Sequence, residues 1–169
     1  MKKLIICLIV FGLAIQTQAQ VETKVEKLSE VVIAATNYKY LTKVGLENTS
    51  VPVSLLEQKV ASFDLVASDF YHDEFGSYIV SFYIPEGKIL ATYDNKGNII
   101  RTAERFKDVK MPRNVIEAVA KQYPNWSLTK NLYLVQYYDS RNITKKYKIT
   151  LENGDKRIKV VIDDDGTIL

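Results

Sequence analysis

Residues 92–100, TYDNKGNII, are nearly repeated at residues 161–169, VIDDDGTIL. In each copy an aspartate stands three positions before a glycine, as Asp94 does before Gly97. A calcium loop of the EF-hand type needs a glutamate six residues beyond its glycine, where the first copy has Ala103. Aspartate followed by glycine is instead typical of a tight hairpin turn, because the carboxylate caps the turn and glycine accepts positive φ. We therefore interpret both stretches as turns. The alternative, weak calcium binding in the second copy, would use Asp163, Asp164 and Asp165.

A second pair of similar stretches lies upstream of these turns. Residues 51–63, VPVSLLEQKVASF, match residues 111–123, MPRNVIEAVAKQY, with a proline at the second position of each. Proline suits the first turn of a helix, and the apolar residues that follow recur at helical spacing. The two matches predict an internal duplication in which each unit begins with a helix.

Each predicted helix precedes segments with the alternating, aromatic and β-branched character of strands. In the first unit the predicted strands are residues 68–75, 77–85, 88–94 and 98–106, and in the second they are 126–139, 144–152, 156–163 and 167–169. A further strand is predicted over residues 28–41, where it could pair with the short last strand. The expected fold is α+β: a tandem duplication of a helix followed by a four-stranded antiparallel meander, with one extra N-terminal strand. Whether the two units share one sheet or form two packed sheets stays open.

The first residues, MKKLIICLIVFGLAIQTQAQ, have the basic, apolar and polar parts of a secretory signal. We expect cleavage near Ala19 and a secreted or periplasmic protein without a membrane span. The only cysteine, Cys7, lies in this signal. Loss of Lys2 and Lys3 leaves a net charge of about +1, which argues against a nucleic-acid partner. The expected organisation is a signal peptide at 1–19, a strand and linker at 20–50, and repeats at 51–110 and 111–169.

The second unit resembles the PepSY-like family, which is related in fold to the β-lactamase inhibitory protein. The residues that stand in the family's order are Pro112, Tyr123, Pro124, Trp126, Tyr147, Asp163, Gly166 and Ile168. The first unit departs from this pattern, because FDLVAS stands where the second has YPNWSL. The resemblance implies a small envelope module with a concave sheet face able to receive a protein or peptide. It does not imply inhibition of a β-lactamase.

No motif of an enzyme stands out. Proteins similar to this one are sometimes labelled nicotinate-nucleotide adenylyltransferases, but that chemistry needs an H-x-G-H signature and a nucleotide-binding fold. The chain has one histidine, His72, with Asp73 and Glu74 beside it and no activated nucleophile. We expect no catalytic residues, no metal site and no cofactor.

Alternation along the predicted strands indicates where a partner would bind. In residues 131–139, Leu132 and Leu134 are expected to face the core while Tyr133 and Tyr137 face the other way. With other exposed aromatic and basic residues they would form a partner-binding sheet face for an acidic or polar chain. The residues of this predicted face are Tyr83, Tyr133, Tyr137, Lys146, Lys148 and Lys159. The sequence thus predicts a non-catalytic binding module, with an envelope structural or stress accessory protein as the alternative and a small enzyme as a remote one.

Overall fold

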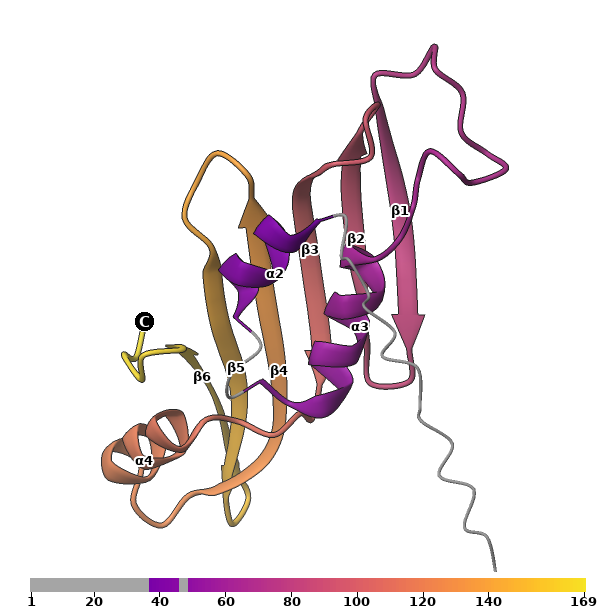
Figure 1. Ribbon diagram of the computed structural model, residues 1–169. Coiled ribbons are helices and arrows are strands. Elements are labelled where there is room, and N and C mark those ends of the chain that lie inside the picture. The colour runs from indigo at the N-terminus through magenta and orange to yellow at the C-terminus, as the bar shows by residue number, and fades with distance from the viewer. Residues whose placement is uncertain (1–36, 46–48) are drawn as a thin grey trace, which may run out of the picture. The chain divides into compact units, whose positions relative to one another are not determined.

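A single antiparallel sheet forms the main structure of the chain. The computed structural model describes residues 37–45 and 49–169. The six strands are neighbours in space in the order in which they follow along the chain, so that β1 and β6 are the edges (Figure 1). Their bounds are β1 Ser77–Ile84, β2 Gly87–Asp94, β3 Ile99–Lys107, β4 Ser127–Tyr138, β5 Thr144–Asn153 and β6 Lys156–Asp163.

In the described part of the chain, three helices accompany the sheet: α2 Tyr38–Val44, α3 Val51–Ala61 and α4 Arg113–Gln122. α3 has a proline in its first turn and packs on β1 and β2, while α2 contacts α3 and β4. Figure 1 shows α2 and α3 in front of the same face of the sheet. The core therefore lies between this face and the helices. None of the helices in the described residues covers the opposite face, which we call the open face.

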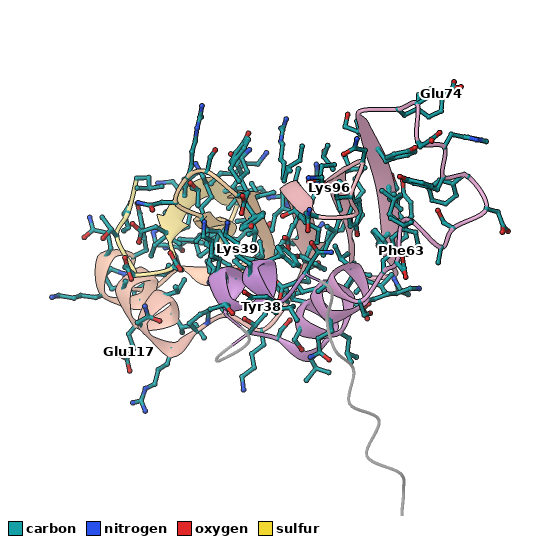
Figure 2. The ribbon with its side chains drawn as sticks, turned by 45° about the horizontal axis from the view of Figure 1, so that its top comes forward. Tyr38, Lys39, Phe63, Glu74, Lys96 and Glu117 are labelled. Carbon is teal, nitrogen blue, oxygen red and sulfur yellow. The ribbon has the colours of Figure 1, made fainter. Side chains whose placement is uncertain are left out.

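Strand alternation explains which side chains enter the core. In β2, Ile89, Ala91 and Tyr93 are buried, while the residues between them are partly or fully exposed. The same period of two is seen over most of the other strands, because successive side chains of a strand point to opposite faces; it is interrupted in β3, where Ile100 and Arg101 are both exposed. Phe63, at the end of α3, extends the core toward β1 and packs edge-on against Phe82 at 5.4 Å between ring centroids (Figure 2).

The predicted duplication into two four-stranded meanders is wrong. The strands form one six-stranded sheet, with three strands after α3 and three after α4. Residues 68–75, predicted as a strand, lie in a loop of turns, and residues 167–169 contribute only a single bridge between Ile162 and Ile168. The aromatic residues that suggested a strand at 68–75 instead stack on the end of the sheet, as Tyr71 does on Tyr78. The α+β class itself is compatible with this architecture.

The predicted strand over residues 28–41 is also not observed where the structure describes it. Residues 28–36 lie outside the described residues, whereas residues 38–41 belong to α2. Asn37 holds the start of α2 on the sheet: its Nδ2 donates to the Gly97 carbonyl at 3.1 Å, and its Oδ1 accepts from the Ile99 N–H at 2.7 Å. These buried bonds fix a helix in a segment that the sequence analysis predicted to be a strand.

The interpretation of the two acidic stretches as turns is confirmed. In the first, Asp94 Oδ1 accepts from the backbone N–H groups of Lys96 and Asn98 at 2.9 and 2.8 Å, and Gly97 has φ of 81°. In the second, Asp163 Oδ1 accepts from the Thr167 N–H at 2.7 Å. The carboxylates thus take up backbone donors that the turns leave free.

At position 87, the first residue of β2, only glycine fits, because the backbone of β3 leaves no room for a side chain. A Cβ atom at this position would lie 2.3 Å from the Arg105 carbonyl oxygen and 2.9 Å from the Cα atom of Phe106. Both neighbours are backbone, so the β2–β3 pairing would have to shift. We expect Gly87→Ala to lower the free energy of unfolding by about 2 kcal/mol or more, measured by urea denaturation. Gly76, which has open space around its Cβ position, is the control; an equal loss in Gly76→Ala would contradict this explanation.

Candidate functional site: the basic open face

The open face carries a cluster of basic side chains on its central and C-terminal strands. Cross-strand register brings them together: Lys88 lies opposite Arg105, and Leu134 of β4 lies between Arg105 and Lys146. Figure 2 shows long side chains ending in nitrogen that project from the side of the sheet away from the helices. The basic residues that form this cluster are Lys88, Arg105, Lys107, Lys130, Lys146, Lys148 and Lys159.

These basic side chains line three shallow depressions with volumes of about 360, 340 and 370 Å³. Arg105 borders all three, so the depressions adjoin one another. Apolar side chains form their floors: Leu90 and Leu134 in the first, Leu132 in the third. The open face thus combines apolar area with positive charge at its rim, which is the composition of many protein interfaces.

Among the described residues, no carboxylate forms an ion pair with these basic side chains, although Asp163 of β6 lies opposite Lys146. Two acidic residues border the depressions, Glu104 and Asp108. The Glu104 carboxyl is buried on the helix side, and Asp108 Oδ1 accepts from the Asn131 N–H at 2.9 Å. Within residues 37–45 and 49–169, none of the cluster's basic groups has a carboxylate within 4.0 Å. The open face is therefore a surface of unpaired positive charge on a chain that is nearly neutral overall.

Four of the predicted partner-binding residues lie on this face. Lys148 and Lys159 are exposed, Lys146 is half-buried, and all three border the depressions. Tyr83, on β1, is 64% exposed and lies opposite Lys88.

The predicted exposure of Tyr133 and Tyr137 is wrong. Both are core residues, 4% and 1% exposed. Tyr133 stacks on Tyr147 with ring centroids 4.6 Å apart, and Tyr137 packs edge-on against Tyr40 of α2 at 5.2 Å. β4 carries large apolar groups on both faces, so alternation alone does not say which set is inside. The tyrosines fill the deeper space under the helices, and Leu132 and Leu134 turn to the open face.

Beneath the helices lies a buried pair of acids that the sequence analysis did not identify. Glu57 of α3 and Glu104 of β3 are 1% and 3% exposed, and their carboxyl groups interact with each other. Glu104 Oε1 accepts from the Tyr40 hydroxyl at 2.8 Å and from the Thr102 hydroxyl at 2.6 Å. The Oε2 atoms of both glutamates have no donor among the described residues. A protonated carboxyl group on either glutamate would supply a donor of its own.

The surroundings of this pair keep it protonated at neutral pH. Burial, followed by the charge of Glu104, raises the pKa of Glu57 to about 9, although the ammonium group of Lys145 opposes the shift. Burial also raises the pKa of Glu104, against the hydrogen bonds from Thr102 and Tyr40. Two buried carboxylates this close cannot both ionise without large repulsion, so the pair retains one proton.

Periodicity contained the signal for this pair. Glu57 follows Leu56 on the buried side of α3, and Glu104 alternates with Thr102 and Phe106 on the inner side of β3. The local pattern of each element therefore places its glutamate on the side that faces the core. That they meet depends on α3 lying over the sheet, which neither pattern contains.

A hollow of about 690 Å³ lies on the helix side beside the start of α4. Lys110, Arg113 and Lys145 border it together with Asp164. It also borders Thr49, which follows residues 46–48 outside the described part of the chain.

In the described ranges 37–45 and 49–169, no three His, Cys, Asp or Glu side chains are grouped so that they could hold a metal ion. None of the helices in these ranges has the length and apolar character needed to cross a membrane. His72 lies in the loop before β1, where its ring contacts Phe75 at 6.0 Å between centroids.

The fold and the site together define a class: an α+β protein with a helix-covered sheet whose other face is open and basic. No family model, curated protein or solved structure matches the chain. The resemblance to the PepSY-like family stays a prediction from the sequence.

Proposed function

We propose that this protein is a non-catalytic binding module of the cell envelope that holds an acidic segment of a partner protein on its open sheet face. The observation that carries the proposal is the cluster of unpaired basic side chains around apolar depressions. The envelope location rests on the secretory pattern of the first twenty residues, which lie outside the described part of the chain.

Charge and shape favour an acidic polypeptide over a compact small molecule. The depressions are shallow and adjoin along several strands, so a ligand must extend across the face to reach Lys88 and Lys159 together. A polypeptide with alternating acidic and apolar residues would place carboxylates on the basic rim and apolar side chains over Leu132 and Leu134. Charged pairs of this kind speed association and select partners, while the buried apolar area contributes affinity.

The test uses a fluorescent 12-residue peptide of alternating Glu and Leu, with a peptide of alternating Lys and Leu as the control ligand. We expect fluorescence anisotropy to show binding of the acidic peptide only. The double variant Lys146→Glu, Lys148→Glu should weaken binding at least about tenfold, because it places two like charges against the ligand's carboxylates. Higher salt should weaken the wild-type complex as well.

The matched control variant is Lys59→Glu, Lys121→Glu, which makes the same change in net charge on exposed positions of α3 and α4. Its affinity should equal that of the wild type. Equal loss in both double variants would contradict a site on the open face. Stronger binding of heparin than of the acidic peptide would instead indicate a surface for sulfated polysaccharide and would reject the acidic protein segment.

A further inference from the structure

β1 is an edge strand whose own sequence lacks the usual protection against pairing. Its sequence, SYIVSFYI, contains no charge, no proline and no glycine, and its pairing with β2 is regular over all eight residues. Ile79 and Tyr83 are 74% and 64% exposed. Natural proteins usually interrupt such an edge with charges, proline or a bulge, because its free backbone groups accept another strand.

The opposite edge shows the contrast. β6 carries Lys156, Arg157 and Lys159 within eight residues. The chain then turns back along it, and the Leu169 N–H donates to the Val161 carbonyl at 2.9 Å. Among the described residues, one edge of the sheet is thus charged and bonded to the returning chain, whereas the other is uncharged and its backbone has no partner strand.

Hairpin geometry identifies the backbone groups that β1 presents outward. β1 and β2 are joined by a two-residue turn closed by the pair Ile84 and Gly87. The closing pair of such a hairpin is hydrogen-bonded, so Ile84, and then every second residue, bonds to β2. The Lys107 N–H donates to the Glu86 carbonyl at 2.7 Å, so the backbone groups of Glu86 point toward β3. By alternation those of Lys88 also point toward β3 and those of Gly87 point toward β1, which agrees with a hydrogen-bonded pair of Ile84 and Gly87. The residues whose backbone groups point away from β2 are Ser77, Ile79, Ser81 and Tyr83.

These outward groups have no hydrogen-bond partner elsewhere in residues 37–45 and 49–169. The loop of residues 62–76 extends beyond β1 (Figure 1), but its backbone hydrogen bonds are internal, such as that from the Phe75 N–H to the His72 carbonyl. Its polar contacts with β1 go to a side chain, the Tyr78 hydroxyl. Within the described part of the chain, the main-chain edge of β1 therefore has no strand paired with it.

We propose that the β1 edge pairs with β1 of a second copy of this chain, antiparallel, about a two-fold axis at Val80. This register bonds Ser77 to Tyr83 of the second copy and Ile79 to Ser81, and so uses every outward group. Two copies of a strand that carries charges of one sign would repel each other. β1 has no charged residue, so two copies of it can pair without repulsion. An acidic segment, by contrast, would gain nothing from β1, because the basic cluster begins on β2 with Lys88. The inference is independent of the proposed function.

Sedimentation equilibrium of the full chain tests the dimer. We expect a concentration-dependent dimer that Ile79→Lys weakens at least about tenfold, because the two new charges would lie diagonally across the new strand pair. Gln136→Lys is the matched control, since Gln136 is exposed on the same face in the central strand β4. A monomer at about 100 μM, or equal weakening by both variants, would overturn the proposal.

Cysteine cross-linking tests the register without depending on affinity. In a Cys7→Ser background, Val80→Cys should oxidise to a covalent dimer, because a non-hydrogen-bonded pair brings Cα atoms within disulfide range. Ile84→Cys should not, since the two copies of this residue would be about 27 Å apart along the strands. Failure of Val80→Cys to cross-link, or equal cross-linking of both variants, would reject pairing at this axis.

Discussion

The protein is expected to lose stability as the pH rises from about 5 to about 8.5, by roughly 2 to 4 kcal/mol of unfolding free energy. The cause is the buried pair of Glu57 and Glu104. Burial and the neighbouring acid raise the folded-state pKa of Glu57 to about 9, from the ordinary value of 4.5. Between these two values the folded chain holds a proton that the unfolded chain has released. Its contribution is fully present below the unfolded pKa and is lost as the pH approaches the folded one.

Glu57→Gln should remove most of this dependence and make the protein more stable than the wild type at about pH 8. The amide of glutamine donates to the Glu104 carboxylate without needing a proton from solution. Urea denaturation at a series of pH values measures the effect. Glu117→Gln is the control, because Glu117 is an exposed glutamate on α4 paired with Arg113, and it should keep the wild-type slope. A wild-type stability that rises over this range would show that the pair is ionised in the folded protein.

Tyr133→Ala is expected to cost about 3 to 5 kcal/mol of unfolding free energy, enough to unfold a domain of marginal stability. The side chain lies between the stacked ring of Tyr147 and that of Phe106, at centroid distances of 4.6 and 6.5 Å, so its removal leaves a cavity in the core. Chemical denaturation followed by circular dichroism measures the loss.

Tyr83→Ala is the matched control, since it deletes the same side chain from the exposed face of the same sheet. Its unfolding free energy should lie within about 0.5 kcal/mol of the wild type. Similar losses in the two variants would contradict the assignment of Tyr133 to the core and Tyr83 to the surface. For the same reason, loss of binding in a Tyr133 or Tyr137 variant would report on folding and not on a partner surface.

Part of the candidate site could be predicted from the sequence because it depends on local alternation. In β5, Tyr147, Ile149 and Leu151 alternate with Lys146 and Lys148. One side of the strand is apolar and the other is basic, so the apolar side must face the core. In β4 both sets are apolar, and local sequence does not choose between them. The structure chooses through cross-strand contacts, since the inward phase places Tyr133 beside Tyr147 and Phe106.

The sequence by itself determined the features that depend on neighbours along the chain. Proline and helical spacing marked α3 and α4, alternation marked the six strands, and Asp94 and Gly97 marked the turn between β2 and β3. Only the tertiary structure decided that the strands form one sheet, that Tyr133 is buried, and that Glu57 meets Glu104. These outcomes depend on contacts between elements far apart in sequence, in which limited core volume and the cost of burying charge decide among arrangements that are locally equivalent.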